Sequence, residues 1–386
     1  MQIRCLAVAM LVGLLSPMAC AQTKDIDAAV DAERYSGLVR KLRPFAQAGD
    51  ALAQFRLGWM HLHGVDGPAN AGEAMHWYRK SAEQGNPDAQ YNLGQMLALG
   101  QGVAKNETEA LSWYRRAAAQ GHAAAQFTLG AWHAFGRVLA KNESDALFWY
   151  RKAAEQGYAK AQYNLGLMLN NGQGVNRNAE EAVQWFRRAA EQGEPQGQSI
   201  LGAMLEHGQG VARDYPEAVR WYRMAAEQGN ANAQVNLGVL LSRGEGVEKD
   251  ESEAVRWYRE AAEQGSAAGM DNLGTCYLLG TGVGRDVEQA ARWYEQAARL
   301  GHSRAQRNLA RLLRYGNGVP EDAVQAYVWL HLSAAGSRPP QGVEIERDRV
   351  AQTLTPEQLA EGRRLASAWQ LGQPMGRSAA AGTPGR

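Results

Sequence analysis

Apolar and polar residues follow each other along most of the chain in a pattern that repeats every 36 residues. Within residues 107–120, apolar residues recur three and four positions apart, as at Trp113 and Ala117, which is the spacing of one face of an amphipathic helix. Gly121 then stands where a helix end favours left-handed backbone. Another amphipathic pattern follows over residues 123–135. Each period therefore predicts a pair of helices.

The period holds over eight copies. A tryptophan marks the same position in each: Trp77, Trp113, Trp149, Trp185, Trp221, Trp257, Trp293 and Trp329. A glycine recurs with the same period at Gly49, Gly85, Gly121, Gly157, Gly193, Gly229, Gly265 and Gly301. Eight copies of a helix pair at a fixed period predict an all-α solenoid, in which each copy packs on its neighbours and the Trp-Tyr pair lies in the core.

One column of the repeat predicts helix caps. It reads Asn70, Asn106, Asn142, Asn178, Asp214, Asp250, Asp286 and Asp322, whose side-chain oxygens can accept from the free amides of a helix start. Three residues later stands Glu, Asp or Gln, the expected partner in a capping box. Asn106 and Asn142 also begin Asn-x-Thr and Asn-x-Ser sequons, so a glycan acceptor is the alternative to a cap.

Two further columns predict contacts between helices. An arginine column includes Arg151, and the glutamate one turn later, such as Glu155, is expected to neutralise it. A glycine column inside the other helix runs through Gly94 and Gly130 although glycine disfavours helices, which predicts close approach of a neighbouring helix. We expect facing alanines such as Ala118 to allow that approach.

The shared motif, AxAQxxLGxxxxxGxGVxxxxxxAxxWYRxAAEQG, resembles the Sel1-like repeat family, relatives of the tetratricopeptide repeat, over about residues 50–337. The resemblance implies a right-handed α/α superhelical solenoid of helix-turn-helix repeats. It also implies a protein that holds partner proteins and assembles complexes, often in bacterial envelopes, rather than a catalyst. Asp66 and Val138 replace the second loop glycine in copies one and three, so their turns are expected to differ.

The two ends of the array predict terminal caps. Residues 22–49 are expected to form an N-terminal capping helix, with Leu38, Leu42, Phe45 and Ala46 packing inwards. Residues 338–370 are expected to form C-terminal capping helices, one of which starts at a Thr-Pro pair, Thr355-Pro356. Residues 371–386 are expected to be a disordered tail.

The first 21 residues have the features of a secretion signal. Arg4 precedes an apolar run over residues 6–15, and Ala19-Cys20-Ala21 fits the small-x-small cleavage pattern, so the mature chain is expected to start at Gln22 and to lie in the periplasm or outside the cell. Lipidation of Cys20 is the alternative. Cleavage leaves a net charge of zero, which argues against nucleic acid as a partner, and no transmembrane segment is expected in the mature chain.

The sequence predicts no catalytic, cofactor or metal site. Motifs of serine hydrolases, nucleotide-binding loops and zinc proteases are missing from it. His61 and His63 are two residues apart and point to different sides of a helix. Cys276 stands in a column of methionine, leucine and tryptophan, so we expect a buried apolar side chain there rather than a nucleophile.

A partner-binding face is the remaining candidate. The helix that opens each copy, such as residues 123–135, has variable residues at its fifth, ninth and thirteenth positions, which lie on one side. This face is aromatic in the N-terminal copies and polar or basic towards the C-terminus. The candidate binding residues are Phe55, Trp59, His63, Tyr91, Gln95, Leu99, Phe127, Phe135, Tyr163, Arg307 and Arg311.

Two interpretations stay open for the aromatic residues at the fifth position, Phe55, Tyr91, Phe127 and Tyr163: they pack between helices, or they line a concave groove that takes a peptide or a helix. The leading hypothesis is an exported scaffold for protein–protein interactions in the bacterial envelope. The alternative is a cell-wall glycan-binding protein or cell-wall-associated enzyme. A secreted factor that engages a host protein is a third possibility.

Overall fold

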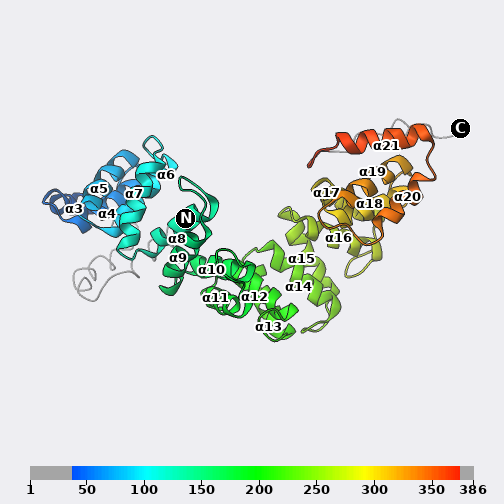
Figure 1. The fold of residues 1–386 in the computed structure, drawn as a ribbon, viewed down its shortest axis with the longest axis horizontal. Coiled ribbons are helices and arrows are strands. Elements are labelled where there is room, and N and C mark those ends of the chain that lie inside the picture. Colours follow the sequence, from blue (N-terminus) through cyan, green and yellow to red (C-terminus); the bar gives the residue numbers. More distant parts are fainter. Residues whose placement is uncertain (1–36, 374–386) are drawn as a thin grey trace. The chain divides into compact units, whose positions relative to one another are not determined.

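The computed structural model describes residues 37–373, and these residues form 19 helices. The chain divides into two compact units, Met1–Arg177 and Asn178–Arg386, in each of which successive helices pack on one another (Figure 1). The all-α, helix-turn-helix solenoid expected from the sequence is confirmed. The expected signal peptide, the first part of the N-terminal cap and the tail beyond Gln373 lie outside the described residues.

The first unit holds eight helices among its described residues. They are α3 (Leu38–Gln47), α4 (Ala51–His63), α5 (Ala71–Glu83), α6 (Pro87–Leu99), α7 (Glu107–Ala119), α8 (Ala123–Phe135), α9 (Glu143–Glu155) and α10 (Ala159–Asn171). The even-numbered helices open the copies, and we call them first helices. The odd-numbered helices from α5 onwards are second helices.

The second unit continues the pattern and adds two helices after the last copy. Its helices are α11 (Ala179–Glu191), α12 (Pro195–His207), α13 (Tyr215–Glu227), α14 (Ala231–Arg243), α15 (Glu251–Glu263), α16 (Ala267–Leu279), α17 (Val287–Arg299), α18 (Ser303–Tyr315), α19 (Ala323–Ala335), α20 (Val343–Ala351) and α21 (Pro356–Ala368). First helices here run from α12 to α18.

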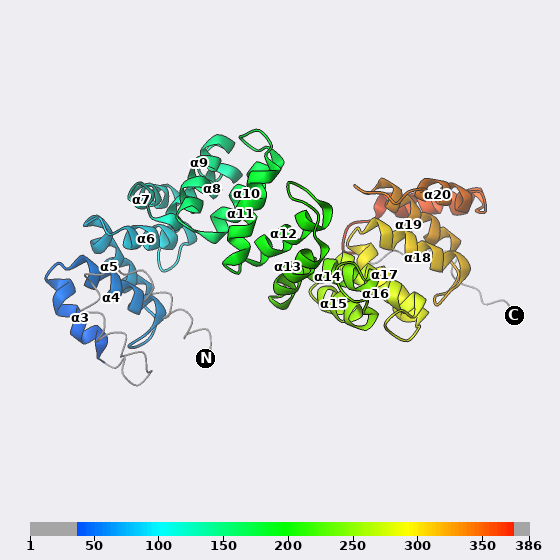
Figure 2. The ribbon, with the colours of Figure 1, turned by 90° about the horizontal axis from the view of Figure 1, so that it is seen from below.

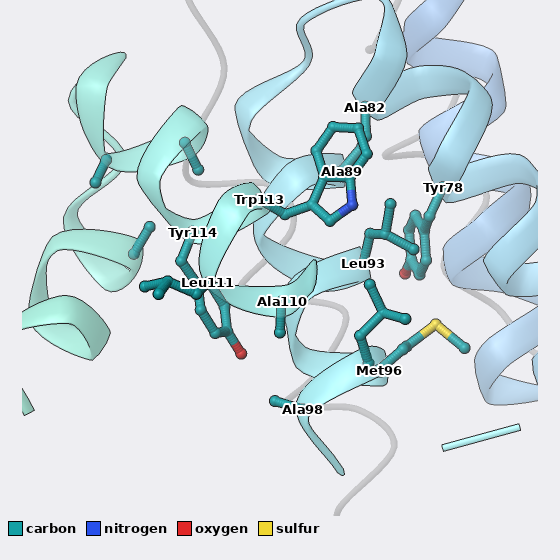
Figure 3. Close-up of a cluster of buried hydrophobic side chains, with 14 of the residues drawn as sticks. Tyr78, Ala82, Ala89, Leu93, Met96, Ala98, Ala110, Leu111, Trp113 and Tyr114 are labelled. Carbon is teal, nitrogen blue, oxygen red and sulfur yellow. The ribbon is translucent and has the colours of Figure 1, made fainter. Parts of the chain in front are cut away.

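The core of each copy is built around a leucine of the first helix. Leu93 of α6 is fully buried, and it belongs to one cluster with Tyr78 of α5 and with Trp113 and Tyr114 of α7. Figure 3 shows Leu93 beside Tyr78, with Trp113 and Tyr114 completing the cluster. The Trp-Tyr pair is therefore core, as the sequence predicts.

Glycine in the first helix makes room for the tyrosine of that pair. A Cβ atom at Gly94 would lie 2.8 Å from Cε1 of Tyr114, and one at Gly238 would lie 2.6 Å from Cε1 of Tyr258. Close approach is confirmed, but the expectation that alanines such as Ala118 face the glycine is wrong. An aromatic ring, not a second small residue, fills the space.

The Asn/Asp column caps the second helices, but it does not form capping boxes. The side chain of Asn106 accepts from the amide of Glu109 at 3.0 Å, as predicted. The backbone N–H of Asn106 donates to the carbonyl of Leu97 at 2.8 Å. It therefore does not bond to the Glu109 side chain, as a capping box would require. Of the described helices, only α21 has the reciprocal box, between Thr355 and Gln358.

The glutamate three residues after the cap links two copies instead of closing a capping box. Glu217 accepts from the indole Nε1 of Trp221 at 3.1 Å and from Nη1 of Arg187 in the preceding copy at 2.5 Å. Arg223 bonds to Glu253 in the next copy in the same way. The hydrogen bond to the glutamate 30 residues ahead is the main cause that raises the pKa of Arg187 and Arg223. The glutamate one turn later, Glu191 or Glu227, adds a Coulombic contribution in the same direction, so the predicted neutralisation is present but is the smaller effect. The hydrogen bonds from Arg187 and Trp221 lower the pKa of Glu217 despite its partial burial.

Paired glutamines form a second polar link. Nε2 of Gln228 donates to Oε1 of Gln198 at 2.8 Å, and Gln198 in turn donates to the carbonyl of Ala190 at 3.1 Å. In the copy that spans α16 and α17, Met270 and Leu300 stand at the two glutamine positions. In the last copy, by contrast, Gln306 keeps its bond to the carbonyl of Ala298 while Gly336 stands at the second glutamine position, and Oε1 of Gln306 is buried with no hydrogen-bond partner.

The turns between helices follow the glycine pattern except where the sequence departs from it. Val138 has a φ of 61° and is the one non-glycine residue with positive φ among residues 37–373. In the other departing copy, Asp66 is followed by Gly67, which takes a φ of 137°. The two turns therefore differ from the rest, as expected. Left-handed backbone at a β-branched residue is strained.

Terminal helices cover both ends of the described array. In α3, Ala46 is buried and Leu42 packs beside it, but Phe45 is 62% exposed, so its predicted inward packing is wrong. At the other end α20 and α21 both pack on α19, and Figure 2 shows α18, α19 and α20 side by side. Leu365 of α21 is buried against α19, and Trp369 meets Trp329 edge to face at 5.8 Å.

We predict that Gly94→Ala destabilises the first unit although alanine is the better helix former. The added Cβ must displace the Tyr114 ring, and overpacking outweighs the gain in helix propensity, for a net loss of about 1–2 kcal/mol. Urea unfolding followed by tryptophan fluorescence measures the change. Gly72→Ala, at an exposed position in the first turn of α5, is the matched control and should not destabilise; equal effects of the two substitutions would contradict the ring-packing account.

We predict that His302→Asn reduces acid sensitivity of the second unit. Nδ1 of His302 accepts from the amide of Ala305 at 3.3 Å, which requires an unprotonated ring, and burial lowers the pKa of His302 below its usual 6.5. This contribution is present above pH 6.5 and is lost as the pH falls through the lowered pKa. Asn230 caps the equivalent helix without titrating. Unfolding free energies at about pH 7.5 and about pH 5 should differ less in the variant; an unchanged difference speaks against the cap.

Candidate partner-binding face

The fifth, ninth and thirteenth residues of the first helices form what we call the first-helix face. The structure gives the three positions different surroundings. Fifth-position side chains are buried or half-buried, ninth-position side chains range from half-buried to exposed, and thirteenth-position side chains are exposed in all eight copies. Each position therefore has to be assessed separately as a candidate for binding.

The aromatic residues at the fifth position pack on the tyrosines of the second helices. Phe55 lies 5.8 Å from Tyr78 between ring centroids, and Phe127 lies 5.6 Å from Tyr150. Both rings are half-buried, as is that of Tyr163. The contacts favour the core interpretation for this position, with one ring edge left at the surface.

Tyr91 is held from three sides. Its ring lies 5.8 Å from Tyr114 and stacks on His122 at 4.7 Å, while its hydroxyl accepts a hydrogen bond from Nε2 of Gln95 at 2.7 Å. Burial is the main cause that raises the pKa of Tyr91, so the phenol stays neutral. The exposed amide of Gln95 thereby becomes a fixed polar group on the face.

Trp59 and His63 form a stacked pair in the first copy. Their rings are 4.4 Å apart and inclined by 29°. Nδ1 of His63 donates to the carbonyl oxygen of Trp59 at 2.9 Å, which fixes the imidazole over the half-buried indole. The pair presents one polar edge and one aromatic surface to solvent.

The thirteenth position carries the exposed apolar side chains. Leu99 is 70% exposed and Phe135 is 81% exposed, and they occupy the same position in neighbouring copies of the first unit. Leu279 and Tyr315 form the corresponding pair in the second unit. Because each of these residues is the last before a helix-ending glycine, it projects from a rigid helix end. Large exposed apolar side chains that recur at one position of the face make that position a candidate for binding.

Asp271 shows that the fifth position is structural in the second unit as well. Its carboxylate is fully buried, accepts from Nδ2 of Asn308 at 3.0 Å and pairs with Nε of Arg304. Side chains of α18 thus neutralise and bond the Asp271 carboxylate, and these contacts link α16 to α18. A buried carboxylate with these partners serves the packing of the unit.

Arg307 and Arg311 are engaged inside the chain. Both guanidinium groups bond to the carboxylate of Glu346 on α20, Arg311 from Nη2 at 2.6 Å and from Nε at 3.1 Å. Burial raises the pKa of Glu346, but the bonds from the two arginines outweigh it and bring the pKa to about 2. The two predicted partner-binding arginines therefore hold the C-terminal cap.

A basic cavity next to this ion pair is missed by the sequence analysis. It has a volume of about 270 Å³ and is lined by Arg311, Arg314, Tyr315, Glu346, Arg349 and Val350, with Ala310 and Leu330. The Arg-x-x-Arg spacing of Arg311 and Arg314 was visible in the sequence, but Arg349 joins them from α20. Only the packing of α20 brings these groups together.

The described residues show no arrangement typical of a metal or nucleophile site. Within residues 37–373, no three His, Cys, Asp or Glu side chains are grouped so that they could hold a metal ion. Cys276 is buried, as predicted, and burial raises the pKa of its thiol. None of the helices in the same residues is both long and apolar enough to cross a membrane.

Comparisons with known proteins agree with the repeat architecture. A model of the Sel1 repeat matches eight consecutive segments that together cover residues 51–337. A Sel1 repeat protein from Oxalobacter formigenes is 32% identical in its crystal structure; the match covers 81% of this chain and 89% of that one, with a TM-score of 0.58. No curated protein matches the chain.

Two further crystal structures are more distant in geometry. One is a protective antigen present in uropathogenic Escherichia coli strains, which is described as displaying an SLR fold. It is 29% identical, covers 95% of this chain and 99% of its own, and has a TM-score of 0.47. The other is an immunity protein from Pseudomonas aeruginosa, 24% identical over 60% of this chain and 81% of its own, with a TM-score of 0.35.

We predict opposite consequences for two phenylalanines of α8. Phe127→Ala removes a ring packed on Tyr150 and should lower the free energy of unfolding by about 2 kcal/mol. Phe135→Ala removes an exposed ring and should change it by less than about 0.5 kcal/mol. Urea unfolding of both variants measures the difference. Equal losses would show that the Phe135 side chain is part of the core.

Proposed function

The chain belongs to the Sel1 repeat family, and we propose that it is an exported scaffold that holds a protein partner on its first-helix face, within the bacterial envelope. The observation that carries the proposal is the exposure of Leu99 and Phe135 at equivalent positions of neighbouring copies. The partner would be a peptide or an amphipathic helix. The proposal includes no catalytic step.

The geometry of the first unit supports this use of the face. Leu99 and Phe135 project from the ends of adjacent first helices, which are fixed by the buried core behind them. Large apolar side chains at the same position of consecutive first helices are the kind of anchor points that an amphipathic helix or an extended peptide uses. The Trp59–His63 pair and the amide of Gln95 add polar groups beside them.

The export part of the proposal rests on the N-terminal sequence. A basic Arg4, a short apolar run over residues 6–15 and Ala19-Cys20-Ala21 together support cleavage after Ala21. A protein released in this way would meet its partner in the periplasm or outside the cell. A lipid on Cys20 would instead anchor the same scaffold to a membrane.

A cell-wall glycan is the second candidate ligand. The exposed ring of Phe135 favours it, because aromatic side chains also stack on sugar rings. The two candidates differ in what should lie against the thirteenth position. A protein partner would bury Leu99 as well as Phe135, whereas a sugar would need the aromatic ring alone.

Site-specific cross-linking in cells tests the proposal. A photoreactive amino acid at position 99 or 135 should give a covalent adduct with the same protein, because both positions face one partner. Position 112, an exposed serine on α7 of the same unit, is the matched control and should give no such adduct. Mass spectrometry identifies the adduct.

Four outcomes contradict parts of the proposal. The same adduct from position 112 would show contact unrelated to the first-helix face. Adducts with peptidoglycan fragments from position 135 alone would favour the glycan. A purified chain whose N-terminus is Met1 rather than Gln22 would contradict export, and an acylated Cys20 would favour the lipoprotein.

A further inference from the structure

The cavity between α18, α19 and α20 has an excess of positive charge. Glu346 is the one carboxylate on its wall, and it is already bonded to both Arg307 and Arg311. Among the described residues, neither Arg314 nor Arg349 has an ion-pair partner. The chain as a whole has a net charge of only +1, so this concentration of arginines is local.

Arg314 and Arg349 approach the cavity from two different helices. The guanidinium of Arg314 lies over the ring of Tyr315, 5.6 Å from its centroid, and both residues line the cavity. Arg349 comes from the last turn of α20. Planar guanidinium groups that converge from two sides suit an oxyanion, because each can donate two parallel hydrogen bonds.

The size and floor of the cavity restrict the ligand further. Its volume of about 270 Å³ is below the range of pockets that enclose whole small-molecule ligands. Ala310, Leu330 and Val350 make part of the lining apolar. The cavity thus fits a charged group that carries a short apolar side chain.

The cavity also lies where the first-helix face ends. Tyr315 is the thirteenth residue of α18, which is the first helix of the eighth copy. Arg243 and Leu279 are the exposed residues at the same position in the two preceding copies of the second unit. Beyond Tyr315, Glu346 of α20 is bonded across the fifth and ninth positions of α18. A partner peptide that lay along this face towards α20 would reach the C-terminal cap, and its end would lie at the cavity.

We propose that this cavity binds the C-terminal carboxylate of a peptide whose last residue is apolar, with Arg314 and Arg349 as the anion-binding groups. The inference rests on the proposed function, because it names the end of the partner chain that the scaffold would hold. The peptide's last side chain would lie on Leu330 and Val350. Tyr315 would cover the preceding residue.

Two peptide pools test the proposal on the mature chain, residues 22–386. Both are biotinylated hexapeptides randomised at the last three positions; one pool ends in a free carboxylate and the other in an amide. We expect retention of free-acid peptides with apolar last residues, and at least about tenfold less retention of their amides. Arg314→Gln together with Arg349→Gln should remove the difference.

Arg363→Gln is the matched control, because it removes one exposed arginine from α21, outside the cavity, and should leave retention unchanged. Urea unfolding of the double variant shows whether the fold is kept. Equal retention of acids and amides, no retained peptide, or retention insensitive to the double variant would each overturn the proposal. Inorganic phosphate that binds the wild-type cavity when no peptide does would identify a phosphate site instead.

Failure of this inference and failure of the proposed function can be told apart. Cross-linking at positions 99 and 135 reports on the first unit, whereas the peptide pools report on Arg314 and Arg349 of the second. An adduct in the first unit without peptide retention refutes the carboxylate site alone. The absence of both the cross-linked adduct and the peptide retention refutes the scaffold as well.

Discussion

The contact between a tyrosine ring and a glycine of the neighbouring helix is the constraint on which the rest of the structure depends. It sets how closely a first helix and the following second helix approach, as at Gly94 and Tyr114. The same closeness buries Leu93 completely. The contact recurs at Gly58, Gly130, Gly202, Gly238 and Gly274, whereas the fourth copy has Phe186 at the tyrosine position and the last copy has Ala310 and Leu330 at the two positions. Where it is present, packing well below the surface sets the arrangement of the first-helix ends. The exposed side chains can then vary without disturbing the stack.

Hydrogen bonds between polar side chains add specific contacts where successive copies pack. A glutamine pair and a glutamate shared by a tryptophan and an arginine recur at fixed positions. Each group satisfies a buried donor or acceptor that would otherwise destabilise the interface. One copy replaces both glutamines, by Met270 and Leu300, and the last copy keeps Gln306 with Gly336 at the second position.

The sequence predicts the fold well because the period, the caps and the core columns are local patterns. Helix bounds such as Ala123–Phe135 follow from them, as does the buried Trp113. The partners of the arginines and the capping glutamates could not be predicted, because they lie 30 residues away and depend on how copies stack. Candidate binding residues divide for the same reason: exposure separates Phe135 from Phe127, and a glutamate of the expected C-terminal cap bonds to Arg307, a contact that the sequence does not reveal.

The row of arginine–glutamate links stops before the array of copies does. After Arg259, the arginine column continues with Glu295 and His331, and the glutamate column ends in Gln289 and Gln325. The last copies therefore present neither the donor nor the acceptor that an interior copy offers. Repeats that pack on their own kind carry an inherent tendency towards end-to-end polymerisation, since such contacts do not close. The changed side chains of the final copies thus remove a polar contact that end-to-end stacking would use, in addition to the surface that the capping helices cover.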